Sequence, residues 1–185
     1  MIASDIHGSA YYCDLMLKAF AREKADRLLL LGDILYHGPR NPLPRDYDPK
    51  KVIELLGGVK EKIFCVRGNC DADVDLAVLP FPVSGDCALM PVGEKMIYAT
   101  HGHVYHPDNL PLHIAGDILL YGHTHIPALR EVNGIMCINP GSVSLPKEDS
   151  KHSCIFFRDG IFGWNDLETG DYYRHYDPLG EEKHM

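Results

Sequence analysis

The sequence lacks the features of several special classes of protein. None of its apolar runs approaches the length of a transmembrane helix, and the N-terminus lacks the basic and then apolar pattern of a signal peptide. Internal repeats, low-complexity segments and domain linkers are also missing. We therefore expect one cytoplasmic domain that spans residues 1–185 and has no membrane partner.

Paired cysteines are missing as well. The six cysteines show no Cys-x-x-Cys spacing, and several lie inside apolar runs such as residues 63–66 and 135–138. This usage is typical of reduced, buried thiols in a cytosolic protein and not of a disulfide framework.

Basic residues are scarce relative to acidic ones. The chain has 18 Lys and Arg against 26 Asp and Glu, which gives a formal net charge of −8. On average such a field repels a nucleic-acid polymer, so we expect no partner of that class. A small phosphate substrate is a different case, because metal ions can supply positive charge locally.

Short apolar runs alternate with helical patterns along most of the chain. Residues 1–4, 27–31, 62–66, 95–100, 117–121 and 134–138 are typical of strands, and residues 11–23 and the segment after Asp48 are typical of helices. Residues 153–176 alternate aromatic and polar side chains, as antiparallel strands do. This order predicts an α/β fold in which two β-sheets pack face to face with helices outside.

Glycine and metal-ligating residue types follow five of the predicted strands. The residues concerned are Asp5, His7, Asp33, Asn69, His101, His123 and His125. In α/β sheets the carboxyl ends of strands form ligand sites, so residues far apart in sequence can converge there. Carboxylate, imidazole and carboxamide groups together suit ions such as Mn²⁺, Fe²⁺ or Zn²⁺. The pattern favours one metal site over a set of unrelated structural turns.

These motifs resemble those of a known family. The stretches that carry the resemblance are Asp5-x-His7, Gly32-Asp33, Gly68-Asn69-x-Asp71, His101-Gly-His103 and Gly122-His123-x-His125. They are similar to the calcineurin-like metallophosphoesterase superfamily, and residues 37–44, 67–71 and 139–147 look like its bacterial YfcE-type phosphodiesterases. The resemblance implies a four-layer fold, with two face-to-face β-sheets flanked by helices on both outer faces.

The resemblance also implies a dinuclear metal centre. Asp5, His7 and His125 would hold one metal ion, Asn69, His101 and His123 a second, and Asp33 would bridge both. Mn²⁺ is the expected ion, with Fe, Zn, Mg and Ni as alternatives. The implied activity is hydrolysis of small phosphodiesters by a hydroxide that the two metals activate. Similarity to the YfcE-type enzymes also makes a homo-oligomer an expected assembly.

Outside the metal ligands, three further residues are candidates for catalysis. Cys70 stands where many family members have a histidine that protonates the leaving group, and Asp71 would lie beside it. A thiol is a poor proton donor for that role, so we expect a preference for good leaving groups, unless His103 acts instead. Arg40 is the candidate for gripping a substrate phosphate; the alternative is a solvated side chain on a stiff, proline-rich loop.

Two rival functions stay open at this stage. The retromer subunit of this fold is similar to the chain but has a compromised metal set, so a protein-binding scaffold is one alternative. A phosphomonoesterase or dinucleotide-polyphosphate hydrolase using the same site is the other. The complete set of ligand positions, including Asp33, favours catalysis.

Overall fold

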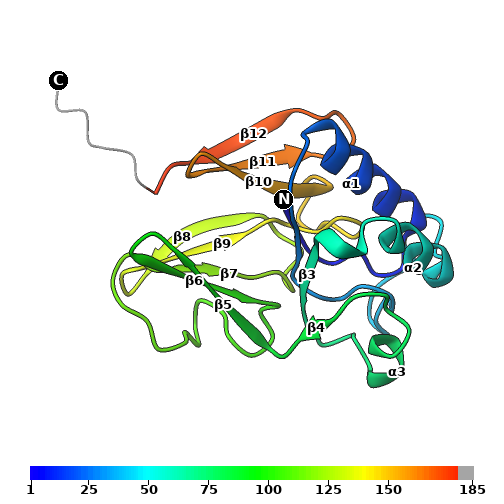
Figure 1. Ribbon diagram of the computed structural model, residues 1–185, viewed down its shortest axis with the longest axis horizontal. Helices are drawn as coiled ribbons and strands as arrows, with labels where there is room; N and C mark the ends of the chain where they lie inside the picture. Colours follow the sequence, from blue (N-terminus) through cyan, green and yellow to red (C-terminus); the bar gives the residue numbers. More distant parts are fainter. Residues whose placement is uncertain (179–185) are drawn as a thin grey trace.

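Two β-sheets pack face to face in the computed structural model, which describes residues 1–178 (Figure 1). The larger sheet has the strand order β12-β11-β10-β1-β2-β3-β4, and the smaller has the order β5-β6-β7-β9-β8. The strands of the larger sheet are β1 (Ile2–Ala3), β2 (Leu28–Leu30), β3 (Ile63–Val66), β4 (Val83–Ser84), β10 (Ser153–Arg158), β11 (Ile161–Asp166) and β12 (Tyr172–Tyr176). Those of the smaller sheet are β5 (Cys87–Val92), β6 (Lys95–Thr100), β7 (Ile118–Leu120), β8 (Ala128–Val132) and β9 (Ile135–Asn139).

The central strands of both sheets run parallel. In the larger sheet β1, β2, β3 and β4 form parallel pairs, and in the smaller sheet β6, β7 and β9 do so. Parallel strands covered on both faces need continuous apolar sequence, and every residue of β2 and of β7 is buried. Leu29 and Leu31 from one sheet meet Ile118 and Leu120 from the other in the core between the sheets.

Two helices cover the outer face of the larger sheet (Figure 1). Helix α1 (Ala10–Arg22) begins after Ser9, whose hydroxyl accepts a hydrogen bond from the Tyr12 amide at 3.3 Å. Helix α2 (Pro49–Gly57) begins after Asp48, whose carboxylate accepts from the Lys51 amide at 3.0 Å. A short 3₁₀ turn, η1 (Lys60–Lys62), then leads into β3. Both main helices lie where the sequence predicts them.

The prediction of two face-to-face sheets with flanking helices is confirmed, with one difference. Within residues 1–178 the helices pack on the side of the larger sheet, including the four-residue α3 (Asp73–Leu76). On the outer face of the smaller sheet, Leu119 and Tyr121 pack against Leu110 from the loop after β6. In the described range a loop contributes to the face where the resemblance implied helices. None of the helices in this range has the length and apolar character that a membrane span requires.

The sequence pattern did not predict β5 and β8, the two edge strands of the smaller sheet. Strand β5 contains Pro91 and has no buried residue, and β8 carries the charged Arg130 and Glu131. Sequence patterns identify strands by apolar periodicity, which an edge strand with a solvent-facing side does not need.

The two sheets approach each other closely where β7 ends beside the end of β1. A Cβ atom at Gly122 would lie 2.8 Å from Cβ of Ser4 and 3.0 Å from the Asp5 carboxylate. The glycine therefore fixes the distance between the sheets at the point where the first polar residues emerge.

We predict that Gly122→Ala destabilises the protein by about 1–3 kcal/mol, because the added methyl group overpacks a closely packed junction. Gly85→Ala is the matched control, since nothing lies within 4 Å of a Cβ at that position. Thermal unfolding of both variants tests the claim. Equal melting temperatures for Gly122→Ala and Gly85→Ala would contradict the claim that the sheets are closely packed at Gly122.

Candidate metal centre

All seven predicted ligands lie in loops that leave the carboxyl ends of strands. Asp5 and His7 follow β1, Asp33 follows β2, Asn69 follows β3, His101 follows β6, and His123 and His125 follow β7. Because both sheets place these ends at the same edge, the seven side chains form one continuous group. Their convergence was predicted from the sequence. They form two donor groups, with Asp33 between the groups.

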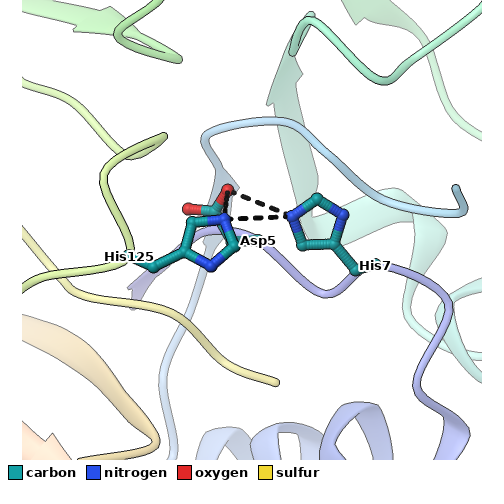
Figure 2. A group of neighbouring side chains, drawn as sticks. All are labelled: Asp5, His7 and His125. Atoms are coloured by element: carbon teal, nitrogen blue, oxygen red, sulfur yellow. Dashed lines mark hydrogen bonds and ion pairs between the residues drawn. The ribbon is translucent and has the colours of Figure 1, made fainter. Parts of the chain in front are cut away.

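Asp5, His7 and His125 form the first donor group (Figure 2). The Asp5 Oδ1 atom lies 3.6 Å from His7 Nε2 and 3.3 Å from His125 Nε2. The two Nε2 atoms are 3.2 Å apart. All three side chains are buried. This group therefore offers one oxygen and two nitrogens to a single ion.

Asn69, His101 and His123 form the second donor group. His101 Nε2 lies 3.0 Å from Asn69 Oδ1 and 3.3 Å from His123 Nδ1. Asp33 lies between the two groups, because its Oδ2 atom is 3.6 Å from His7 Nε2 and 3.3 Å from His101 Nε2. This is the position that a bridging carboxylate requires.

Backbone contacts orient three of the imidazole rings. The Nδ1 atoms of His7, His101 and His125 lie 2.6–2.7 Å from the carbonyl oxygens of residues 36, 31 and 145, respectively. A ring that donates from Nδ1 presents a lone pair at Nε2, which is the usual arrangement of a metal-bound histidine.

The donor atoms need a cation among them. Neutral His7 and His125 rings would face each other with lone pairs at 3.2 Å, so either a proton or a metal ion must lie between them. The Asp5 Oδ1 atom is buried and accepts no hydrogen bond. Mixed oxygen and nitrogen donors in two adjoining groups fit two divalent ions.

The carboxylates are aimed by backbone amides. Asp5 Oδ2 accepts from the His123 amide at 3.2 Å, which leaves Oδ1 facing the first donor group. Asp33 Oδ1 accepts from the Cys70 amide at 2.8 Å, which leaves Oδ2 facing both groups. Each carboxylate therefore has one oxygen fixed by the backbone and one directed at the centre.

Five of the seven ligands adopt a left-handed backbone conformation. The φ angles are 60° at Asp5, 47° at His7, 56° at Asp33, 64° at His123 and 63° at His125. Each such residue costs about 1–3 kcal/mol unless its surroundings enforce it. At these five positions the strand ends turn sharply and direct side chains into the site.

The charges of the ligands are strongly coupled. Burial acts to raise the pKa of Asp5, but the adjacent His125 and His7 imidazoles hold it well below its usual range. Burial acts to lower the pKa of His101, yet the Asp33 and Asp5 carboxylates raise it to about 9. Burial and the nearby His101 lower the pKa of His123. A proton on His101 therefore competes with metal binding.

Asp71, predicted as a catalytic residue next to Cys70, makes contacts with the backbone of two loops. Its buried carboxylate accepts hydrogen bonds from the amides of Asp33 (2.9 Å), Ile34 (2.8 Å) and Gly68 (2.7 Å). These contacts tie the loop after β2 to the loop after β3. They favour a positioning role, in which Asp71 holds the backbone of the bridging residue.

Cys70 lies beside the centre, as predicted. The Asn69 amide nitrogen donates to its Sγ atom at 3.2 Å, which directs the Asn69 oxygen toward His101. Burial and the Asp33 carboxylate raise the pKa of the Cys70 thiol to about 12. His103 also lies nearby, with its ring centroid 5.5 Å from that of His101, and its Nδ1 atom is buried without a partner.

A cleft of about 720 Å³ opens onto the centre. Arg40 lines it, as its predicted contact with substrate requires, and so do Tyr36, Arg67 and Lys147. Sequence reasoning missed the latter two basic residues. Arg67 precedes the Gly-Asn motif by one residue and Lys147 ends the 139–147 stretch, but only the fold shows that both face the cleft.

The family assignment follows from comparison with known proteins. A model of the calcineurin-like phosphoesterase superfamily domain matches residues 1–158. The chain belongs to this superfamily.

Individual members of the superfamily are similar over most of the chain. Phosphodiesterase YfcE of Escherichia coli (strain K12) is 46% identical over 147 residues, which is 80% of each chain. The solved structure of Yfce, a phosphoesterase from E. coli, covers 96% of this chain and 97% of its own, with a TM-score of 0.92 and 40% identity. The probable metallophosphoesterase YsnB of Bacillus subtilis is 32% identical over 89 residues, or 44% of this chain and 48% of its own.

More distant solved structures are similar to this chain in fold alone. Zinc-complexed Vps29 from Entamoeba histolytica covers 96% of this chain and 97% of its own, with a TM-score of 0.58 and 17% identity. Identity at this level carries no information about activity.

We predict that the affinity for Mn²⁺ rises with pH up to about pH 9, because His101 must lose a proton whose pKa is raised to about 9. Calorimetric titration at pH 7.5 in buffers of different ionisation enthalpy should show release of about one proton or more per protein. His113→Gln, which changes a half-buried imidazole outside the centre, should leave this release unchanged. A binding enthalpy that is independent of the buffer would contradict the prediction.

Proposed function

We propose that the protein is a metal-dependent phosphodiesterase that hydrolyses small phosphodiesters. The observation that carries this proposal is the position of Asp33, whose Oδ2 atom faces both donor groups at once. Two like-charged ions close together need a shared anion, and the bridging carboxylate provides it. Membership of the superfamily and 46% identity to a protein named phosphodiesterase support the same activity.

Mn²⁺ is the metal that we propose, with Fe, Zn, Mg and Ni as alternatives. Asp5, His7 and His125 would hold one ion, Asn69, His101 and His123 the other, and Asp33 both. When bound, the ions supply Lewis acidity and lower the pKa of a bound water. The oxygen and nitrogen donor set suits all of these ions, so ligand type favours none of them strongly.

The chain itself keeps the centre in a fixed geometry. Asp71 holds the backbone at Asp33, and the Cys70 amide holds one oxygen of the Asp33 carboxylate. In the reaction a water oxygen forms a bond to phosphorus and gives up a proton to the solvent, and the phosphorus–oxygen bond to the leaving group breaks with its electron pair on the leaving oxygen. Arg40 lines the cleft where a guanidinium can bind a phosphate oxygen.

In this proposal the protein offers the leaving group only a weak proton donor. The Cys70 thiol, with its raised pKa, is a weak proton donor at neutral pH. Esters whose leaving group departs as a stable anion, such as aryl or nucleotide phosphates, are therefore the preferred substrates.

We further propose a single cytoplasmic domain. The six cysteines are free thiols, and four of them are buried, which supports a reducing compartment. Assembly into a homo-oligomer stays a prediction from the resemblance.

Hydrolysis of bis(p-nitrophenyl) phosphate by chelator-treated protein, with and without added Mn²⁺, tests the function. We expect turnover that requires the metal and that falls by at least about a hundredfold in Asp33→Ala, which removes the bridging anion. Asp26→Ala, an exposed carboxylate remote from the centre, is the matched control. A folded protein that shows no turnover with any of the candidate ions would favour the scaffold alternative.

Cys70→His should accelerate hydrolysis of diesters with poor, alkyl leaving groups by on the order of ten- to a hundredfold, because imidazole is a better proton donor near neutral pH. Aryl diesters should gain much less. Rates for a series of leaving groups in the variant and in Asp26→His, a control at an exposed position before β2, at the end of the strand opposite to Asp33, measure the difference. An equal loss on every substrate would show that residue 70 has no connection with the leaving group.

A further inference from the structure

The cleft collects basic side chains in an otherwise acidic protein. Arg40, Arg67 and Lys147 line it from three separate loops, although the whole chain carries a formal net charge of −8. The acidic groups that also line it are already engaged: Asp33 faces the metal donors and Asp71 accepts three backbone amides. The exposed part of the cleft is therefore locally cationic.

Lys147 and Arg67 lie next to different donor groups. The Lys147 amide donates to the carbonyl of His125 at 3.2 Å, which ties this residue to the first donor group. Within residues 1–178 no hydrogen bond or ion pair involves its exposed ammonium group. Arg67 lies two residues before the ligand Asn69, and its Nε atom donates to the Asp71 carbonyl at 3.0 Å.

The ion pair of Arg67 with Asp73 occupies only part of the arginine's guanidinium group. Its Nη2 atom lies 3.1 Å from Asp73, whose side chain is 88% exposed, so solvent screens this pair. The contact fixes the arginine at the edge of the cleft while other N–H groups stay free to bind an anion.

This positive charge exceeds what a simple phosphodiester needs. Such a diester carries one negative charge, which the metal ions offset at the reacting phosphorus. With Arg40 assigned to the reacting phosphate, Lys147 and Arg67 remain, and they suit a second anionic group a short distance away.

An aromatic ring lies in the same cleft. Tyr36 is 40% exposed, and its carbonyl oxygen lies 2.7 Å from His7 Nδ1, which fixes the residue next to the first donor group. An exposed ring at this place offers a flat surface for stacking a base.

We propose that the substrate is a nucleotide-like phosphodiester that carries a second phosphate group, and that Lys147 and Arg67 bind this second phosphate. The inference rests on the proposed function and deepens it by naming the substrate class. Lys147 and Arg67 are then specificity-determining residues, with Tyr36 holding the base.

Two chromogenic substrates isolate the second phosphate. They are the p-nitrophenyl ester of thymidine 5′-phosphate and the same ester with an added 3′-phosphate, so the leaving group is identical. We expect the wild-type enzyme to prefer the 3′-phosphorylated ester in kcat/KM by about tenfold, mainly through KM. The preference should fall as NaCl is raised, because salt screens exposed charges.

Substitutions of Lys147 test whether this residue causes the preference for the 3′-phosphorylated ester. Lys147→Gln should reduce the ratio of the two kcat/KM values by about five- to tenfold, and Lys147→Arg should retain it. Lys50→Gln changes an exposed lysine that does not line this cleft, and it should keep the wild-type ratio.

The outcomes separate this inference from the proposed function. Hydrolysis of both esters with equal kcat/KM, or a ratio unchanged in Lys147→Gln, would overturn the second-phosphate site and leave the phosphodiesterase intact. Failure to hydrolyse either ester with any candidate metal, by a folded protein, would overturn both.

Discussion

The position of two carboxylates determines the rest of the site. Asp5 and Asp33 each give one oxygen to a backbone amide and turn the other toward the imidazole nitrogens. A carboxylate free to rotate could pair with a single histidine and leave the two donor groups unconnected. Because the backbone fixes both, one oxygen of Asp33 lies between the groups, and a shared anion is available to two cations.

Preserving that geometry requires the two sheets, because the amides that hold each carboxylate belong to other loops. The His123 amide that holds Asp5 comes from the smaller sheet, and the Cys70 amide that holds Asp33 comes from a neighbouring strand. Left-handed conformations at five ligands show that the loops are strained to achieve this. The packed sheets and the contacts of Asp71 supply the rigidity that keeps such residues in place.

Charged side chains form two tiers: an inner tier at the candidate metal centre and an outer tier along the cleft. Buried carboxylates and imidazoles compensate one another at the centre, where metal ions would replace protons. Basic side chains then line the cleft outside it, against the acidic average of the surface. The inner tier suits chemistry at phosphorus, and the outer tier is where the proposed second phosphate would bind. In this proposal the reaction class depends on the candidate ligands and the substrate preference on the loops around them.

The sequence alone determined the alternating elements, including the two main helices, and the seven candidate ligands, because these depend on local periodicity and residue type. The tertiary structure decided three other matters. It showed Asp71 as a support for the backbone, it left the outer face of the smaller sheet to a loop, and it brought Arg67 and Lys147 into the cleft. None of these leaves a local pattern, since each depends on contacts between loops that are distant in sequence and meet only when the sheets pack.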